Sequence, residues 1–256
     1  MSRYSYAGKT ALVFGGTSGI GAAVVEAFAD AGANLVTLGR DSKANDALAA
    51  KLAARNVKAL CLTGDIASEA DVEEVINSAI KHFGSVDIAI NNAGILDGEL
   101  KPLHQKTAKE FDAVFDVNVR GMFFALKHEL AAMLEKKSGV IINMSSVAGN
   151  RGGPMMSLYV ASKHAVEGLT KSAAIEAAPH GIRVMMVRPH AVDTPMIDQI
   201  VGPGESADRD SLRGTVPLGR LGTPREQANV ILFLCSEDAS YMTGSPVCID
   251  GGYHAG

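Results

Sequence analysis

Short apolar runs recur along the whole chain, and longer Ala-rich segments with helical spacing follow them. The runs are Ala11–Phe14, Asn34–Leu38, Val57–Leu62, Val86–Ile90, Val140–Met144, Ile182–Val187 and Pro246–Ile249. This alternation is typical of βαβ units, in which parallel strands form one sheet and helices cover its faces. The sequence therefore predicts an α/β fold. Because no linker, repeat or low-complexity run divides the chain, one domain is expected over residues 1–256.

Three of the expected helices have boundaries that the sequence marks. The first runs from about Gly19 to Ala31 and ends before Gly32, because glycine readily adopts the left-handed conformation that closes a helix. A long helix is expected over roughly Lys106–Lys136, with a break near Gly121, and another over Met155–Ala178.

One stretch, Asp193–Arg220, departs from this alternation because it is rich in glycine and proline. A loop of that length in a compact domain is more often functional than structural. We expect an irregular segment there that acts as a substrate lid over residues 193–220.

Composition limits the partners of the chain. With 47% hydrophobic residues, 27 Gly and only 5% aromatic residues, it suits an Ala/Val/Ile-rich parallel sheet better than a β-sandwich. A formal charge of -4 with mixed signs gives no basic stripe for nucleic acid or an anionic membrane. The first residues lack an apolar leader, and no stretch approaches about 18 uninterrupted apolar residues. A small-molecule substrate and a cytoplasmic location are therefore expected.

The three cysteines, Cys61, Cys235 and Cys248, are widely separated in the sequence. None belongs to a Cys-x-x-Cys pair or has a histidine at metal-ligand spacing. We expect buried thiols that pack as small hydrophobic side chains, and no metal site.

The candidate ligand site begins with a glycine-rich turn. Directly after the first expected strand the chain reads Gly15-Gly16-Thr17-Ser18-Gly19-Ile20-Gly21, and a helix follows at once. Glycines here permit a tight turn, let backbone N–H groups approach a pyrophosphate and bring the helix against the strand, while the helix N-terminus supplies positive potential. The strand–turn–helix context favours a dinucleotide site over a purely structural turn.

The end of the second expected strand bears on which dinucleotide binds. It reads Leu38-Gly39-Arg40. An acidic side chain at the Gly39 position would hydrogen-bond the ribose 2′-hydroxyl of NAD, whereas an adjacent arginine can pair with the 2′-phosphate of NADP. The sequence therefore predicts a preference for NADP(H). The neighbouring Asp41, and the lack of a basic residue inside the glycine turn, keep NAD(H) as the alternative.

Tyr159 and Lys163 form the candidate proton-transfer pair. They lie four residues apart near the start of an expected helix, so they share one helix face. An isolated tyrosine, with a pKa of about 10, is a poor base at neutral pH, but a nearby cation stabilises the phenolate and lowers that pKa. This spacing alone is common on helix surfaces, so its meaning depends on the surrounding motifs.

Six motifs, taken in order, resemble those of the short-chain dehydrogenase/reductase family over nearly the whole chain. They are Gly15–Gly21, Asn91-Asn92-Ala93-Gly94, Asn118 in Asp-Val-Asn-Val-Arg-Gly, Ser146 in Ser-Ser-Val-Ala-Gly, Tyr159-x-x-x-Lys163 and Asp250-Gly251-Gly252. The resemblance implies a single-domain, Rossmann-type, doubly wound parallel sheet of about seven strands flanked by helices. It also implies an oxidoreductase that reduces a ketone to a secondary alcohol, or catalyses the reverse reaction.

The same resemblance assigns four catalytic residues. Ser146, preferred over Ser145 because it lies 13 residues before Tyr159, would hydrogen-bond and polarise the substrate oxygen. Tyr159 would donate a proton to the developing alkoxide, or remove it in the oxidation direction. Lys163 would lower the pKa of Tyr159 and hold the ribose hydroxyls of the nicotinamide. Asn118 would hold a water that relays protons through Lys163, with a backbone-bonding amide as the alternative.

Cofactor contacts follow from the same matching. Asn91 is expected to contact the adenosine ribose and Asp65-Ile66 the adenine, whereas Asn92 is interpreted as mainly structural. The full expected set is Gly15, Thr17, Ser18, Gly19, Ile20, Gly21, Arg40, Asp65, Ile66, Asn91, Ala93, Gly94, Tyr159, Lys163, Pro189, Val192 and Thr194.

Two positions depart from the family pattern. Phe14 stands where a threonine commonly links the glycine turn to the Asn91–Gly94 turn, so a hydrogen bond worth about 1 kcal/mol is expected to be missing. His190 stands where glycine commonly follows Pro189, and we expect it to line the substrate pocket rather than to catalyse.

The expected pocket walls are mostly apolar, with flexible methionines, and they predict a hydrophobic ketone, bulky or aryl. They are Ile95, Leu96, Asn150, Pro154, Met155, Met156, His190, Val192, Met196 and Ile200.

Two other functions and the assembly complete the expectations. A 3-oxoacyl carrier-protein reductase shares every motif, and Lys136, Lys137 and Arg151 are the cations that could dock its acidic carrier. A non-catalytic NADP(H)-sensing module is disfavoured because the Ser/Tyr/Lys set is intact. Members of the family usually pair through their long helices and the C-terminal strand, so a homotetramer or a homodimer is expected.

Overall fold

The computed structural model describes residues 3–255, and within them the chain forms one sheet of seven parallel strands in the order β3-β2-β1-β4-β5-β6-β7. The strands are β1 (Thr10–Phe14), β2 (Asn34–Gly39), β3 (Ala59–Thr63), β4 (Ile88–Asn91), β5 (Gly139–Met144), β6 (Ile182–Pro189) and β7 (Pro246–Ile249). The doubly wound, Rossmann-type sheet that the sequence predicts is confirmed.

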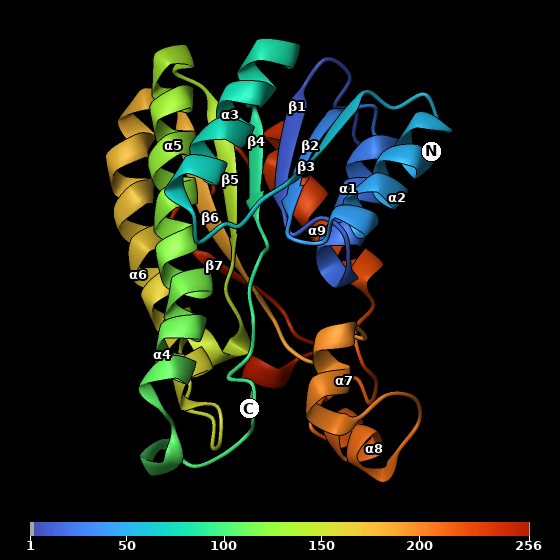
Figure 1. Ribbon diagram of the computed structural model, residues 1–256, viewed down its shortest axis with the longest axis vertical. Coiled ribbons are helices and arrows are strands. Elements are labelled where there is room, and N and C mark those ends of the chain that lie inside the picture. Colours follow the sequence, from blue (N-terminus) through green and yellow to red (C-terminus); the bar gives the residue numbers. More distant parts are fainter. Residues whose placement is uncertain (1–2, 256) are drawn as a thin grey trace.

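Helices cover both faces of this sheet (Figure 1). One face carries α1 (Gly19–Asp30), α2 (Ser42–Ala53) and α9 (Pro224–Cys235). The other carries α3 (Glu69–Phe83), α5 (Gly121–Lys136) and α6 (Ser157–Ala177). The remaining helices are α4 (Ala108–Phe115), α7 (Pro195–Val201) and α8 (Ala207–Gly214), with short 3-10 turns at Leu103–Gln105, Val147–Gly149, Ala178–His180, Glu237–Ala239 and Tyr253–Ala255.

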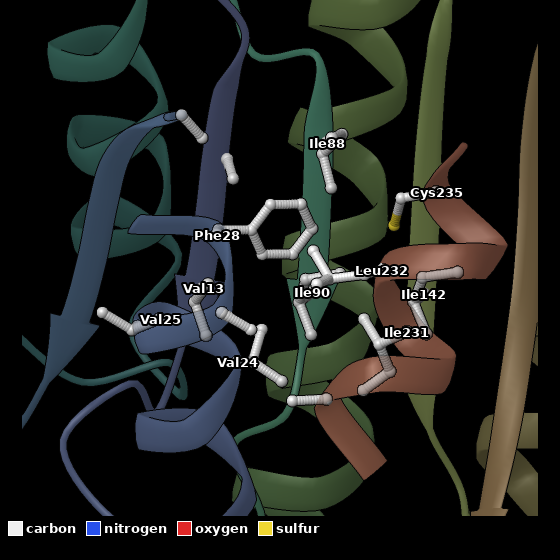
Figure 2. Close-up of a cluster of buried hydrophobic side chains, with 14 of the residues drawn as sticks. Val13, Val24, Val25, Phe28, Ile88, Ile90, Ile142, Ile231, Leu232 and Cys235 are labelled. Carbon is white, nitrogen blue, oxygen red and sulfur yellow. The ribbon is translucent and has the colours of Figure 1, made fainter. Parts of the chain in front are cut away.

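The two helical layers explain why the strands are apolar along their whole length. Successive side chains of a strand point to opposite faces. Val13 therefore packs with Phe28 and Ile90 beneath α1 and α9, as Figure 2 shows, whereas Leu12 and Phe14 pack against the opposite layer. Burial on both faces requires hydrophobic residues at nearly every strand position, which is the pattern that marked the strands in the sequence.

Parallel pairing places the carboxyl ends of all strands at one edge of the sheet. The strand order reverses between β1 and β4, where the connections run to opposite faces. Ligands of open α/β sheets bind outside this switch point. In Figure 1, α7 and α8 lie beyond that edge and are separated from the helical layers.

The central helix is interrupted more strongly than the sequence predicts. It divides into α4 and α5, and a π-helical turn at Asp116–Arg120 joins them. Gly121 begins α5 immediately after this turn, and a Cβ there would lie only 2.9 Å from a side-chain methyl of Ile66. The predicted break near Gly121 is therefore present, and the glycine permits close packing of the helix on the segment after β3.

The expectation that Asp193–Arg220 is irregular is wrong, because Pro195–Val201 and Ala207–Gly214 are helical, whereas its role as a lid stays a prediction. Pro195 occupies the first turn of α7, where its missing N–H costs nothing, and Ser206 caps α8. Arg209, whose side chain is 6% exposed, pairs with Asp193 and Asp198 and ties the two helices together. Local capping and these ion pairs outweigh the breakers in the sequence.

The cysteines differ from the prediction in one respect. Cys235 is buried and Cys61 is half-buried, but Cys248 is exposed. Cys248 belongs to β7, an edge strand of the sheet. Edge strands are covered less completely than central ones, so apolar composition alone did not reveal its exposure.

No helix among residues 3–255 combines the length and the apolar character that are needed to cross a bilayer.

A buried polar cluster lies between β4, β5 and α5. Asn91 Nδ2 donates to Glu129 Oε2 and to Asn143 Oδ1, each at 2.9 Å. Burial raises the pKa of Glu129 to about 8. Glu129 Oε1 and Asn91 Oδ1 have no hydrogen-bond partner in the described part of the chain. A proton on Glu129 removes the charge that burial disfavours, so we infer that the folded protein holds Glu129 protonated near neutral pH.

This protonation predicts a stability that falls as the pH rises. The unfolded state releases the Glu129 proton near pH 4.5, whereas the folded state keeps it up to about pH 8. Between these values the unfolding free energy should decrease by up to about 1.4 kcal/mol per pH unit. Glu129→Gln places an amide where the protonated acid stands and should remove this contribution. Urea unfolding of both proteins at several pH values measures it; parallel pH dependences would contradict the inference.

Candidate active site

A cavity of about 370 Å³ lies at the carboxyl edge of the sheet, at the switch point. Its walls come from the segments that follow β1, β2, β3 and β4 and from the start of α7. They include Gly15, Thr17, Ser18, Gly19, Ile20, Arg40, Asp65, Ile66, Asn92, Ala93, Gly94, Ile95 and Thr194. Most of the cofactor contacts expected from the sequence are thus brought together in one cavity.

The glycine turn has the shape that a pyrophosphate needs. Gly15 and Gly19 adopt φ values of +75° and +52°, a region that favours glycine. Ser18, the N-cap of α1, makes no side-chain capping hydrogen bond within residues 3–255. The backbone N–H groups of the first helical turn are therefore available to an anion, and the helix dipole favours negative charge there.

Gly21 acts differently from the glycines that line the cavity. A Cβ at this position would lie 2.0 Å from the carbonyl oxygen of Gly15 and 2.5 Å from Asn92 Nδ2. Its role is therefore to allow α1 to pack against the turn.

The hydrogen bond expected to be missing because of Phe14 is replaced by another. Asn92 Nδ2 donates to the carbonyl oxygen of Gly15 at 3.0 Å and so links the turn after β4 to the glycine turn. Phe14 itself is fully buried and contributes to the core. The two turns are therefore joined without the threonine hydroxyl.

The predicted role of Asn91, the last residue of β4, needs correction, whereas the structural role expected for Asn92 agrees with its hydrogen bond to Gly15. Asn91 is fully buried, and its amide is bonded to Glu129 and Asn143. A residue without exposed surface offers no contact to a ribose. Asn92 lines the cavity while also supporting the glycine turn.

Arg40 lies at the far end of this cavity, and its side chain is exposed. The adjacent Asp41 caps α2 by accepting from the backbone N–H of Ala44 at 3.1 Å, so its carboxylate has a structural partner.

The space for a side chain at position 39 is small. A Cβ at Gly39 would lie only 3.1 Å from Asn45 Oδ1. Asn45 is buried and joins the ends of β2 and β3 through their carbonyl oxygens. The space for an acidic residue at position 39 is therefore restricted.

A smaller cavity of about 100 Å³ adjoins the first and brings Ser146, Tyr159 and Lys163 together. The two cavities share Ile20, Asn92, Gly94, Thr194 and Met196. The smaller one is also lined by Met144, Ser145, Pro189, His190, Val192 and Ile197. The sequence predicted the polar trio, His190 and Met196 as neighbours, but not Met144 or Ile197.

Burial controls the ionisation of the two central groups. It raises the pKa of the Tyr159 phenol, and a side-chain hydrogen bond with Ser146 opposes that rise. It lowers the pKa of Lys163 to about 8. Lys163 Nζ donates to the carbonyl oxygen of Met144 at 2.7 Å and lies 5.5 Å from the centre of the Tyr159 ring. Desolvation therefore sets the direction of the Tyr159 pKa shift, and the expected effect of Lys163 on that pKa stays a prediction.

Asn118 is buried in the π-helical turn, and its side chain is occupied by structural contacts. Its Oδ1 accepts from the N–H of Ile95 at 2.8 Å, and its Nδ2 donates to the Ile95 carbonyl at 2.9 Å and to Ser162 Oγ at 3.0 Å. The side chain therefore matches the alternative of a backbone-bonding amide. It holds the segment after β4 against the helix that carries Tyr159.

The C-terminal turn packs against His190, a contact that sequence reasoning missed. The His190 ring stacks on the ring of Tyr253, with centres 3.8 Å apart, and the Arg151 guanidinium lies 4.8 Å from the centre of the same tyrosine ring. His254 bonds both Asp250 and Asn150. Asp250 belongs to the Asp-Gly-Gly motif, but nothing in the sequence marks Tyr253 as a neighbour of His190.

Six of the expected pocket residues lie outside the two cavities, namely Leu96, Asn150, Pro154, Met155, Met156 and Ile200. Leu96 is buried, Met155 is 46% exposed, and Asn150 is bonded to the C-terminal turn. Met156 is the N-cap of α6. The sequence placed these residues at the site, but they line neither cavity.

A buried ion pair supports the ends of β5 and β6. Arg188 binds Glu167 through two nitrogens, at 2.7 and 2.5 Å, and Ser145 Oγ donates to the same carboxylate at 2.9 Å. Such bidentate pairing fixes geometry as well as charge. Ser145 thus has a structural partner, which agrees with Ser146 as the reactive serine.

Ligand atoms of Cys248, Asp250 and His254 lie within 4.8 Å of one another, a grouping that the sequence did not reveal. The Arg188 guanidinium interacts with Cys248.

Comparison with known proteins agrees with this geometry. A family model described as "Enoyl-(Acyl carrier protein) reductase" matches residues 15–254. The 2,5-dichloro-2,5-cyclohexadiene-1,4-diol dehydrogenase of Sphingobium indicum is 40% identical, over 97% of this chain and 98% of its own length. The cyclohexanol dehydrogenase of Acinetobacter sp. is 37% identical, over 96% of this chain and 94% of its own length.

Solved structures are equally similar. Levodione reductase has a TM-score of 0.92 at 36% identity, covering 99% of both chains. A short-chain type dehydrogenase/reductase from Mycobacterium marinum has a TM-score of 0.90 at 35% identity, covering 98% of both chains. ElxO with NADP bound has a TM-score of 0.88 at 33% identity, covering 97% of this chain and 99% of its own.

The fold and the adjoining cavities define a nicotinamide-dependent oxidoreductase. The chain belongs to the short-chain dehydrogenase/reductase family.

Replacing Gly21 tests the close packing of the glycine turn. Gly21→Ala should lower the melting temperature and weaken nicotinamide cofactor binding at least about tenfold, because the turn must move to admit the Cβ. Thermal unfolding and cofactor fluorescence measure the two effects. Gly168→Ala in α6 is the matched control, since a Cβ there meets nothing within 4 Å. Unchanged cofactor affinity in Gly21→Ala would contradict this interpretation.

Proposed function

We propose that the chain is an NADP(H)-preferring oxidoreductase that interconverts a hydrophobic cyclic ketone and its secondary alcohol. The observation that carries this proposal is the meeting of Ser146, Tyr159 and Lys163 in one small cavity that adjoins the larger cavity at the glycine turn. A nicotinamide held across the shared residues would supply or accept the hydride.

The reaction in the reduction direction follows from the positions of these side chains. Ser146 Oγ donates a hydrogen bond to the ketone oxygen and polarises it. Tyr159 gives its phenolic proton to the alkoxide as that charge develops. Burial favours the protonated phenol, so Tyr159 is suited to act as the acid. The Lys163 ammonium, near the ring, stabilises the phenolate that remains.

The cavity walls support a hydrophobic and cyclic substrate. Met144, Val192, Met196 and Ile197 present apolar surface, and His190 closes one side with its ring fixed against Tyr253. Such apolar walls suit a ring better than a flexible chain, because a ring loses less conformational entropy on binding. Relatives whose names specify cyclohexanol, levodione and a cyclohexadiene diol agree with this class.

The preference for NADP(H) rests on Arg40. Its side chain borders the larger cavity and forms no ion pair within residues 3–255, while Asp41 is used as a helix cap. A guanidinium in this position can bind a ribose 2′-phosphate. The structural similarity to ElxO, which binds NADP, is consistent with this assignment.

The alternative of a 3-oxoacyl carrier-protein reductase keeps support from the description of the matching family model. The expected carrier-docking cations are poorly placed for it. Lys136 pairs with Asp87 and, with Lys137, precedes β5, so both lie at the amino edge of the sheet, opposite the site. Arg151 is engaged with Tyr253. Docking of an acidic partner near the site would therefore lack these charges.

The lid and the assembly belong to the same proposal. Met196 of α7 borders both cavities, which suits a lid formed by α7 and α8. Phe111, Phe123 and Ile175 are 45%, 48% and 76% exposed on α4, α5 and α6. Such apolar side chains on the long helices support a homodimer or homotetramer. A cytoplasmic location stays a prediction.

Removing the proton donor tests the chemistry. Tyr159→Phe keeps the ring and its packing but loses the phenolic hydroxyl, so the turnover of ketone with NADPH should fall by about 10²–10⁴-fold. Cofactor oxidation with cyclohexanone-type and aryl ketones, and with a 3-oxoacyl thioester, measures it, and cofactor fluorescence checks that NADPH still binds. Full activity in the variant would exclude Tyr159 as the acid, and turnover of the thioester alone would favour the carrier-protein alternative.

Replacing Arg40 tests the cofactor preference. Arg40→Ala should raise the KM for NADPH about 10- to 100-fold, which corresponds to the loss of a charge-assisted hydrogen bond, and should leave the KM for NADH nearly unchanged. Arg55→Ala, which removes another exposed arginine from the region after α2, serves as the control. Equal effects on both cofactors, or a native preference for NADH, would show that Arg40 does not select the phosphate.

A further inference from the structure

We propose that Asp97, supported by Lys106, is a positioning residue that holds Tyr159 in place for proton transfer. The inference rests on the proposed function of Tyr159 as the proton donor. It concerns a pair of residues that no sequence motif identified.

Asp97 caps the helix that carries Tyr159, although it is far away in the sequence. Its Oδ1 accepts from the backbone N–H of Tyr159 at 2.5 Å, and its Oδ2 accepts from that of Leu158 at 3.1 Å. These N–H groups belong to the second and third residues of α6, the donors that an N-cap side chain normally satisfies. The actual N-cap, Met156, makes no side-chain cap, so Asp97 takes its place.

An ion pair with Lys106 offsets the free-energy cost of burying this carboxylate. Its Nζ lies 3.0 Å from Asp97 Oδ2, and the two side chains are 3% and 0% exposed. A buried charge without a partner would be strongly unfavourable. Lys106 also donates to the carbonyl oxygen of Glu99 at 2.7 Å, which anchors the loop between β4 and α4.

The pair completes a set of contacts between that loop and α6. Ile95, two residues before Asp97, is bonded through both of its backbone groups to Asn118. Asn118 in turn donates to Ser162 on α6. The segment from Ile95 to Asp97 is therefore tied to α6 at two places, one of which is the backbone of Tyr159 itself.

Position matters at this residue because the smaller cavity leaves little room. The phenol must reach a substrate oxygen inside a space of about 100 Å³. A displacement of about 1 Å in a reacting group can reduce turnover by about 10²-fold. The segment before α6 does little to fix the start of the helix, because Met155 adopts φ +64° and no local side chain caps the helix.

The charges of Asp97 and Lys106 should affect the pH midpoint of the Tyr159-dependent reaction, which a purely structural role would not change. The ionisable or polar groups that face Tyr159 are Lys163 on its own helix, Ser146 after β5, His190 after β6, and Asp97 after β4. The paired Asp97 and Lys106 are neutral together. Lys106→Met removes the positive charge beside Asp97 but leaves its two N–H donors in place, so less positive charge near Tyr159 compensates the phenolate.

Two variants separate position from charge. Lys106→Met should raise the pH midpoint of alcohol oxidation by about 0.5–1 unit, because Tyr159 must be deprotonated for that direction. The double variant Asp97→Asn/Lys106→Met is neutral, but its amide offers one acceptor oxygen to two N–H donors. It should keep the native pH midpoint and lose about 10- to 100-fold in turnover, with the cofactor KM within about twofold.

A matched control lies at the opposite edge of the sheet. Asp87 is a largely buried carboxylate that accepts from the N–H of Thr10 at 2.9 Å and pairs with Lys136. Asp87→Asn/Lys136→Met should lose stability but keep both turnover and pH midpoint. If it changes activity as much as the Asp97 double variant does, or if Lys106→Met leaves the midpoint unmoved, the positioning role is wrong.

A measurement without turnover keeps the inference separate from the proposed function. The phenol of Tyr159 can be titrated by its ultraviolet difference spectrum against Tyr159→Phe in each background. A higher midpoint in Lys106→Met supports the inference even if no ketone is reduced, and an unchanged midpoint overturns it. If the double variant does not fold, Lys106→Met alone decides, because it retains the two hydrogen bonds to the helix.

Discussion

The close approach of the glycine turn to the segment after β4 is the constraint on which the rest of the site depends. Gly21 leaves no room for a Cβ against Gly15, and Asn92 bonds the Gly15 carbonyl from the other side of the switch point. This contact joins the two halves of the sheet at their carboxyl edge. It also aims the first turn of α1 into the larger cavity, where an anion would lie.

Buried hydrogen bonds and ion pairs fix the relative positions of the elements around the site. Apolar packing on both faces holds the sheet together, but it allows neighbouring elements to slide. Directional contacts prevent this. Asn118 bonds Ile95, Asp97 bonds the start of α6, and Arg188 with Glu167 fixes the ends of β5 and β6. Each polar group has an energetic cost when unpaired, so the arrangement that satisfies them all is strongly selected.

The substrate side is built from parts that are distant in the chain. His190 from the end of β6, Tyr253 from the C-terminal turn and Arg151 from the segment after β5 stack in succession. The stack fixes the ring of His190, the member of the three that lines the smaller cavity.

By itself, the sequence determined the class of fold and the glycine turn, because apolar strand runs and glycine spacing are local patterns with direct physical causes. It marked Ser146, Tyr159 and Lys163 as candidates only through the resemblance of its motifs to a family, since the Tyr159–Lys163 interval alone is common on helix surfaces. Only the tertiary structure decided that Asn91 faces Glu129, that Met155 points to solvent, and that Asp97 caps α6. The direction of a side chain, and the partner that compensates its burial, depend on elements far away in the sequence. Local periodicity carries no information about them.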